Sequence, residues 1–94
     1  MGVNFEIAYH PLVAKEDISN LGTADKINIK KAIESKLSTN PETFGKPLRR
    51  SLKGYRKLRV GDYRVIYRIE TAKVKIFYIG HRSIVYKKAS NRII

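Results

Sequence analysis

Apolar and polar residues alternate with a period of two in four segments of the chain, and this alternation predicts four β-strands. The segments span residues 3 to 9, 53 to 60, 63 to 69 and 73 to 81. The second and third flank Gly61 and Asp62, a pair that favours a tight turn, so they predict a β-hairpin. In the last segment, alternation assigns Val74, Ile76 and Tyr78 to one face and Lys75, Phe77, Ile79 and His81 to the other.

The predicted hairpin has a basic side and an apolar side. Side chains alternate across a strand, so Lys57 and Arg59 share one face of the first arm while Leu58 and Val60 share the other. In the second arm, Arg64, Ile66 and Arg68 lie on one face. The opposite face carries Tyr63, Val65, Tyr67 and Ile69, which can meet a core.

Two other segments, residues 11 to 20 and 23 to 39, carry apolar residues at helical spacing. Thr23 is a candidate N-cap, and the short connection between the segments predicts an antiparallel helical hairpin. Glu16 and Asp17 are neighbours that point about 100° apart on a helix, so we expect them on a solvated face. Residues 40 to 51 are rich in proline and glycine and predict a loop, and residues 83 to 94 predict a short strand or a frayed helix.

The order of these elements predicts an α+β fold of the form β-α-α-β-β-β. We expect the N-terminal helical hairpin to pack on one face of a twisted, mainly antiparallel four-stranded sheet. The other face, which carries the basic residues, is then expected to be open and concave. At 94 residues the chain is long enough for one small domain, residues 1 to 94.

The composition of the chain indicates the cellular compartment in which we expect to find it. The chain has no cysteine, so disulfides and thiolate chemistry are excluded. No apolar run approaches the roughly 18 residues of a membrane span, and the N-terminus lacks the basic head and apolar region of a signal peptide. We therefore expect a cytoplasmic protein with no membrane partner.

Charge is the most distinctive compositional feature. The 20 Lys and Arg residues outnumber the 8 Asp and Glu residues, giving a net charge of +12. A field of this size attracts polyanions such as RNA or DNA. The cations are concentrated in one third of the chain: Lys46, Arg49, Arg50, Lys53, Arg56, Lys57, Arg59, Arg64 and Arg68. This clustering favours polyanion binding over a lysine-rich surface that serves solubility alone.

Three stretches, together with the order of elements, resemble the RelE/ParE superfamily of toxins from bacterial toxin–antitoxin pairs. The stretches are KPL at residues 46–48, LKGYRKLRVGDYRVIY at 52–67 and IGHRSIVY at 79–86. The resemblance implies a toxin held inactive by a RelB-like antitoxin whose acidic and apolar segment wraps around it. Operator DNA would be bound only through that antitoxin.

The resemblance leaves two activities open. RelE-like members cut messenger RNA in the ribosomal A site and so inhibit translation, whereas ParE-like members poison DNA gyrase without cutting RNA. We favour the RelE-like activity, a ribosome-associated, metal-independent mRNA endoribonuclease, and keep ParE-like gyrase inhibition as the alternative. A third option is a degenerate toxin that only binds its antitoxin and represses its own operon.

The resemblance also assigns roles in RNA cleavage, in which a ribose 2′-OH attacks the adjacent phosphorus and the 5′-oxygen leaves. Lys57 matches a catalytic lysine that favours the attacking hydroxyl. Arg64 matches the arginine that stabilises the phosphorane, a task that suits a guanidinium fork. Arg82 matches an arginine that helps to protonate the leaving oxygen, and Tyr86 would stack on or orient a base. His81 is a secondary candidate for acid or base.

A second set of cations would bind the RNA backbone by charge. These residues are Lys53, Arg56, Arg59, Arg49 and Arg50. We expect no metal and no other cofactor, since cysteine is absent and His10 and His81 lie far apart in the sequence.

Several assignments have plainer alternatives. Lys57 also fits an exposed strand lysine, and Tyr86 fits a core tyrosine beside Val85. A lone strand histidine such as His81 is more often structural than catalytic.

Overall fold

A five-stranded sheet organises the computed structural model, which describes residues 4–93. The spatial order is β1 (Glu6–Tyr9), β5 (Lys73–His81), β4 (Tyr63–Glu70), β3 (Arg56–Val60) and β2 (Lys46–Pro47). β1 pairs with β5 in parallel, and the other neighbours are antiparallel. The mainly antiparallel sheet and the central hairpin are therefore confirmed. The predicted first strand begins later than expected, at Glu6, and its position Val3 lies outside the described residues.

The predicted four-stranded sheet and the predicted loop at 40–51 were wrong in detail. That segment contains a helical turn, α2 (Pro41–Phe44), then β2 and a 3₁₀ turn, η4 (Arg50–Leu52). β2 pairs with β3 through Lys46–Lys57 and Pro47–Arg56. Proline has no N–H to donate, which restricts it to an edge strand such as β2. A two-residue edge strand leaves no alternation to read from the sequence.

The two predicted helical segments are confirmed in position. The first consists of a π-helical turn, η1 (Val13–Asp17), and a 3₁₀ turn, η2 (Ile18–Asn20). The second is α1 (Thr23–Ala32), continued by the π-helical turn η3 (Ile33–Leu37). Ile29, Ile33 and Leu37 are buried against the sheet in the main core. None of the helices in residues 4–93 has the length and apolar character needed to cross a bilayer.

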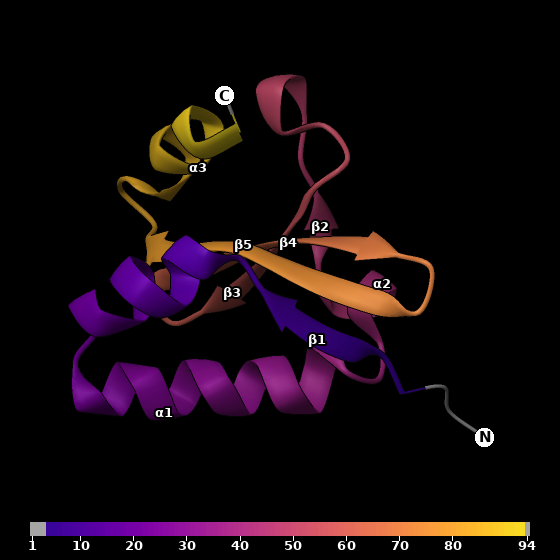
Figure 1. Ribbon diagram of the computed structural model, residues 1–94, viewed down its shortest axis with the longest axis horizontal. Coiled ribbons are helices and arrows are strands. Elements are labelled where there is room, and N and C mark those ends of the chain that lie inside the picture. The colour runs from indigo at the N-terminus through magenta and orange to yellow at the C-terminus, as the bar shows by residue number, and fades with distance from the viewer. Residues whose placement is uncertain (1–3, 94) are drawn as a thin grey trace.

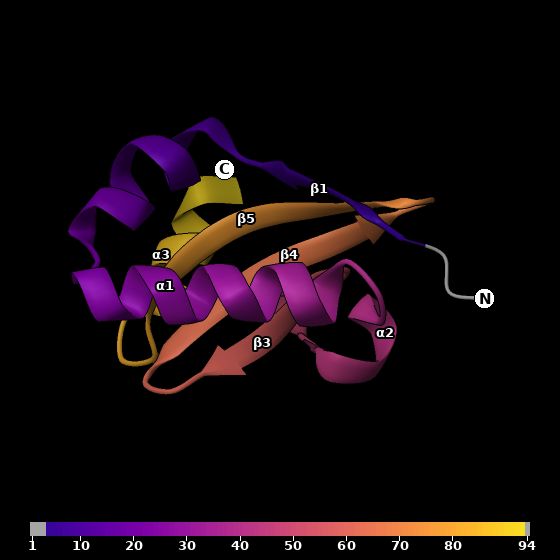
Figure 2. The same ribbon diagram turned by 90° about the horizontal axis from the view of Figure 1, so that it is seen from below.

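The C-terminal tail forms a helix, α3 (Val85–Ile93), on the face of the sheet opposite α1 (Figures 1 and 2). Val85 and Ala89 are fully buried there, in a second apolar cluster with Leu52 and Ile66. The basic face is consequently only partly open, which corrects the expectation of a fully open surface. The i, i+4 spacing of the two buried helix residues is the signal that favours a helix over a strand.

The expected division of β5 into two faces was wrong, because the strand contains a β-bulge. Ile66 pairs with Tyr78 and the next residue of β4, Tyr67, pairs with Ile76, so Phe77 is the extra residue. Past the bulge the alternation is shifted by one position. Ile79 therefore packs in the main core with Ile76, and Tyr78 turns to the second cluster with Phe77.

A buried ion pair joins the N-terminal helical segment to α3. The Arg92 guanidinium donates to both carboxylate oxygens of Asp17, at 2.8 and 3.0 Å, and also to the Phe77 carbonyl at 3.1 Å. Asp17 accepts a further hydrogen bond from the Ile79 backbone N–H at 3.0 Å. The Phe77 carbonyl and the Ile79 N–H lie beyond Ile76, the last residue of β5 that pairs with β1, so the ion pair supplies their hydrogen-bond partners. The expectation of a solvated Asp17 was wrong, since its side chain is only 3% exposed.

Tyr67 connects the sheet to α2. Its ring is fully buried and its hydroxyl donates to the Pro41 carbonyl at 2.6 Å. A Cβ atom at Gly45 would lie 1.6 Å from that hydroxyl oxygen. The close approach of the chain to Tyr67 therefore requires glycine at this position.

Replacing Gly45 with alanine should lower the free energy of unfolding by at least about 2 kcal/mol, because Tyr67 must shift and lose its buried hydrogen bond. The matched control is Gly22→Ala, where the nearest atom to the added Cβ lies at an ordinary 3.7 Å. We expect that control to cost less than about 1 kcal/mol. Urea denaturation followed by circular dichroism compares the two, and equal losses would contradict the proposed contact.

Burial raises the pKa of Tyr67 to about 12, against a weaker lowering effect of Arg56. The unfolded chain ionises this phenol near pH 10, so unfolding releases its proton above that pH. The contribution of Tyr67 to stability is therefore complete below about pH 10 and is lost as the pH rises toward about 12. Urea denaturation at several pH values should show a shallower decline over this window for Tyr67→Phe than for the wild type.

Candidate active site

The β3–β4 hairpin places three cations on the face that α3 partly covers. In the register, Lys57 pairs with Ile66 and Arg59 pairs with Arg64. Ile66 belongs to the cluster beneath α3, so its partner Lys57 lies on that face, and so do Arg59 and Arg64, two positions along each strand. Directly opposed residues lie about 5 Å apart, which brings these cations within reach of one phosphate group.

α3 brings Tyr86 to Lys57. The Lys57 Nζ atom lies 5.4 Å from the centroid of the Tyr86 ring, a cation–π distance. Both side chains are only partly buried, so a ligand can reach them. The two residues are far apart in the sequence, and it is the packing of Val85 and Ala89 on the sheet that sets their contact.

Arg64 is held at the hairpin turn by its own backbone neighbours. One guanidinium nitrogen donates to the Gly61 carbonyl at 3.0 Å and to the Tyr63 carbonyl at 2.9 Å. Gly61 has a φ of +60°, a left-handed conformation that glycine adopts at low cost in a tight turn. The turn therefore fixes the arginine, and its other guanidinium N–H groups remain as donors for a ligand.

Arg82 lies where β5 ends, next to the same turn. Its backbone N–H donates to the Asp62 carbonyl at 2.8 Å, and its Nε atom lies 3.8 Å from an Asp62 carboxylate oxygen. Both side chains are well exposed, so this ion pair is weak and easily exchanged for a phosphate. Arg82 is thus near the hairpin but is not fixed in it.

Two predicted residues lie on the other side of the sheet. His81 pairs with Tyr63, its ring meets the Tyr63 ring edge-to-face at 5.7 Å, and its Nδ1 atom accepts the Ser83 backbone N–H at 3.1 Å. Arg56 donates to the carbonyls of Gly45 and Glu42 at 3.1 and 3.3 Å. The structure therefore does not place His81 or Arg56 beside Lys57.

The remaining predicted cations, Arg49, Arg50 and Lys53, lie in the exposed segment before β3. This segment is tied to α3 by a 2.8 Å hydrogen bond between the hydroxyls of Ser51 and Ser90. It therefore forms a basic margin beside the helix that carries Tyr86 (Figure 1).

The site is electrostatically positive. Among residues 4–93 no carboxylate lies within 4.0 Å of the charged groups of Lys57, Arg59 or Arg64. A phosphate would therefore meet cations that are not already neutralised. In the same part of the chain, no three His, Asp or Glu side chains are grouped so that they could hold a metal ion.

Sequence reasoning missed two features near this site. One is the Asp17–Arg92 pair that holds α3, for which the sequence offers no local signal because the partners are 75 residues apart. The other is an aromatic hollow that includes Tyr55 and Phe77. Strand parity predicts Tyr55 on the same face as Lys57, but it does not show the contact of the Tyr55 ring with Phe77 on β5.

The comparisons with known proteins fit this architecture. The family model of the ParE toxin of type II toxin–antitoxin systems, parDE, matches residues 13–86. Toxin RelE of Mycobacterium tuberculosis is 45% identical over 53 residues, which cover 54% of this chain and 55% of that protein. Toxin RelG of the same organism is 44% identical over 54 residues, 55% of this chain and 62% of that protein. The matches thus span little more than half the length of these curated relatives.

Solved structures extend the similarity over the fold. A chain of the toxin–antitoxin complex RelBE2 from M. tuberculosis superposes with a TM-score of 0.78 and is 31% identical, covering 86% of this chain and 94% of that one. A mutant of Escherichia coli toxin RelE in the free state has a TM-score of 0.65 at 22% identity, covering 97% and 99%. Because the family model matches most of the chain, the protein belongs to the ParE toxin family of type II toxin–antitoxin systems, within the RelE/ParE superfamily.

Proposed function

We propose that the chain is a RelE-like endoribonuclease that cleaves messenger RNA on the ribosome, in the cytoplasm, and so inhibits translation. The observation that carries this proposal is the contact of Lys57 with Tyr86 on the strand face that also carries Arg64. The similarity to proteins named RelE and RelG supports the same branch of the superfamily. We further propose that residues 1–94 act as a single domain.

The proposed reaction is an attack of a ribose 2′-oxygen on the adjacent phosphorus, with departure of the 5′-oxygen. The Lys57 ammonium would stabilise the attacking oxygen as its proton passes to solvent. Arg64 would stabilise the additional negative charge on the phosphorane with a fork already held by the turn. Arg82 would stabilise the leaving oxygen as it gains a proton, and Tyr86 would stack on the base.

We also propose a cognate antitoxin as the partner that restrains the activity. The solved RelBE2 and YoeB–YefM structures are toxin–antitoxin complexes. An antitoxin segment with acidic and apolar residues would complement the cations around Lys57 and the apolar surface beside them. Contact with operator DNA would then occur through the antitoxin, because the antitoxin would cover the basic face of the toxin in the complex.

The alternative is a ParE-like toxin that inhibits DNA gyrase without cutting RNA, and the match to the ParE family model favours it. Two assays on the purified chain separate the activities. Primer extension on a translated mRNA should show cleavage within codons, and a supercoiling assay with purified gyrase should show no inhibition. Gyrase inhibition with intact message would replace the proposed function by the alternative.

The role of Tyr86 gives a graded prediction. Tyr86→Phe keeps the ring over Lys57 and should cleave nearly as fast as the wild type, whereas Tyr86→Leu should cleave about tenfold more slowly through loss of base stacking. Cleavage rates from primer extension, together with circular dichroism to confirm folding, test this. Equal rates for the two variants would remove the stacking role.

A further inference from the structure

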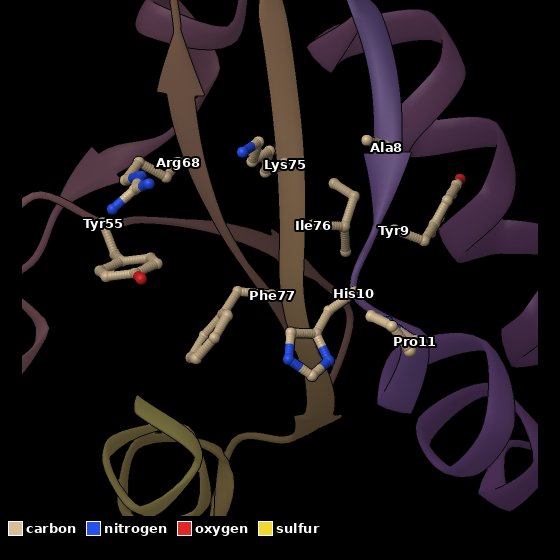
Figure 3. A pocket seen from close by; sticks show the side chains of 9 residues that line it. All are labelled: Ala8, Tyr9, His10, Pro11, Tyr55, Arg68, Lys75, Ile76 and Phe77. Carbon is tan, nitrogen blue, oxygen red and sulfur yellow. The ribbon is translucent and has the colours of Figure 1, made fainter. Parts of the chain in front are cut away.

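A hollow of about 370 Å³ lies beside the Lys57 site and is not part of it (Figure 3). It is bounded by β1, β4, β5 and the residue just before β3. Tyr55 and Phe77, two of its walls, pack against the cluster that α3 covers, so the hollow opens on the same side of the sheet as Lys57. Cavities of this size are large enough for a small planar ligand.

Three rings line one half of the hollow. The Tyr55 and Phe77 ring centroids are 4.9 Å apart with a 41° tilt, and the His10 ring meets Phe77 edge-on at 5.4 Å. All three residues are only partly buried, so a ligand can reach the rings. A concave set of aromatic surfaces fits a flat heterocycle such as a nucleobase, because stacking makes no demand on base identity.

His10 adds a polar group to this aromatic half. Its Nδ1 atom accepts the Leu12 backbone N–H at 3.1 Å, so the neutral ring carries its proton on Nε2. A base edge presents acceptors to such a donor. Figure 3 shows the His10 ring beside Phe77, at the end of the hollow nearest the C-terminal helix.

Cations line the other half. Arg68 lies over the Tyr55 ring, 5.5 Å from its centroid, and Lys75 stands next to it on β5 (Figure 3). Glu70 forms ion pairs with both, at 3.0 Å to Lys75. Two cations share one carboxylate, which leaves the group with a net positive charge that suits a phosphate.

The hollow continues the row of cations that leads from the proposed active site. Arg64, Ile66 and Arg68 share one face of β4, and four residues of a strand span about 14 Å. An extended single strand can cover this distance within a few nucleotides. An RNA held at Arg64 would therefore bring a neighbouring nucleotide to the hollow.

We propose that the hollow is a nucleotide subsite in which an unpaired base of the RNA, at a nucleotide that is not cleaved, stacks against the exposed surfaces of the aromatic walls. Arg68 and Lys75 bind a phosphate of that nucleotide. The subsite rests on the proposed function, since it assumes that RNA is the ligand. The subsite provides a second RNA-binding contact that is separate from the Lys57 site.

The test measures binding rather than cleavage. Fluorescence anisotropy at physiological ionic strength compares single-stranded oligoribonucleotides whose ribose at the cut site is 2′-O-methylated, with and without one base removed at each position in turn. Tyr55→Leu should weaken binding of the intact strand about tenfold. At one position in the strand, removal of the base should weaken binding to the wild type by the same factor. Tyr55→Leu should bind that abasic strand no more weakly than the wild type does, because the base and the ring belong to one contact. When the same assay is repeated over a range of salt concentrations, Arg68→Gln should reduce the dependence of log K on log salt by about 0.7.

The chain offers a matched control on another surface. Phe44 is an exposed aromatic residue with the Lys36 ammonium 5.6 Å from its ring centroid, a pair similar to Tyr55 and Arg68. Phe44→Leu should bind RNA like the wild type. If Tyr55→Leu is folded by circular dichroism and binds RNA like the wild type, the proposed subsite is wrong. The same conclusion holds if Tyr55→Leu keeps its RNA affinity but loses affinity for the antitoxin.

The outcomes separate the subsite from the nuclease. Binding that depends on Tyr55 in a chain that does not cut RNA supports the subsite and rejects the nuclease. Cleavage and binding that are both insensitive to Tyr55→Leu reject the subsite alone. A wild-type chain that binds none of the strands rejects the subsite, and primer extension on translated mRNA then decides the nuclease separately.

Discussion

Replacing Asp17 with alanine is expected to lower the free energy of unfolding by about 3–5 kcal/mol. The reason is that the substitution leaves the Arg92 guanidinium buried without its counter-charge, at a side-chain exposure of only 7%. It also removes the acceptor of the Ile79 backbone N–H. An unpaired buried charge and an unsatisfied backbone donor are among the most costly single changes a small domain can suffer.

The matched control for Asp17 is Asp62→Ala, which breaks the pair with Arg82. That pair is longer, at 3.8 Å, and its carboxylate side chain is 72% exposed, so the expected loss is below about 1 kcal/mol. Urea denaturation monitored by circular dichroism measures both. If Asp17→Ala costs no more than Asp62→Ala, the buried pair does not hold the C-terminal helix in the way described.

The Asp17–Arg92 pair also matters for the site, because Arg92 is on the helix that presents Tyr86. Arg92 lies over the Tyr78 ring, 4.1 Å from its centroid, and so fixes the far end of α3 on the sheet. Burial raises the pKa of Tyr78, with Asp17 as a second cause. The stability of this corner and the contact between Tyr86 and Lys57 are therefore linked through one helix.

The combined variant Lys57→Ala with Arg64→Ala is expected to slow RNA cleavage by at least about 10³-fold. A positioned ammonium at the attacking oxygen and a fixed guanidinium at the phosphorane each contribute about 10²-fold or more, and groups that act together are not additive. Arg64→Lys should recover only part of the loss, since an ammonium cannot replace the planar fork. Primer extension on translated mRNA over a time course gives the rates.

Arg59→Ala is the control for this pair of substitutions. Arg59 is the cross-strand partner of Arg64 and is exposed, so it removes a charge of the same kind from the same face. Its proposed role is backbone binding, and we expect only a few-fold loss that disappears at saturating RNA. A loss as large as that of Arg64→Ala would show that total charge, rather than placement, governs the reaction.

The sequence predicted what depends on short-range periodicity. Strand alternation placed Lys57, Arg59 and Arg64 on one face, because one turn at Gly61 fixes the register of both arms. It failed for His81, because the extra residue Phe77 in β5 shifts the alternation by one position and turns His81 to the α1 side. A bulge of this kind leaves no mark in the pattern of apolar residues.

Contacts between distant segments could not be predicted from the pattern. Asp17 was assigned to solvent because it and Glu16 point about 100° apart on a helix and so do not form a carboxylate pair, and only the packing of α3 supplies Arg92. The contact of Tyr86 with Lys57 depends on the same packing. β2 was not predicted because two residues cannot show alternation. Its strand character comes from pairing with β3.

The central claim is that cations fixed on the β3–β4 face, with Tyr86 beside them, break RNA. Mapping of RNA ends in cells after induced expression of the chain tests it most directly, with the Lys57→Ala, Arg64→Ala variant expressed to the same level. The account predicts new 5′ ends within translated codons for the wild type and none for the variant. Growth arrest by the wild type with its messages intact would contradict it.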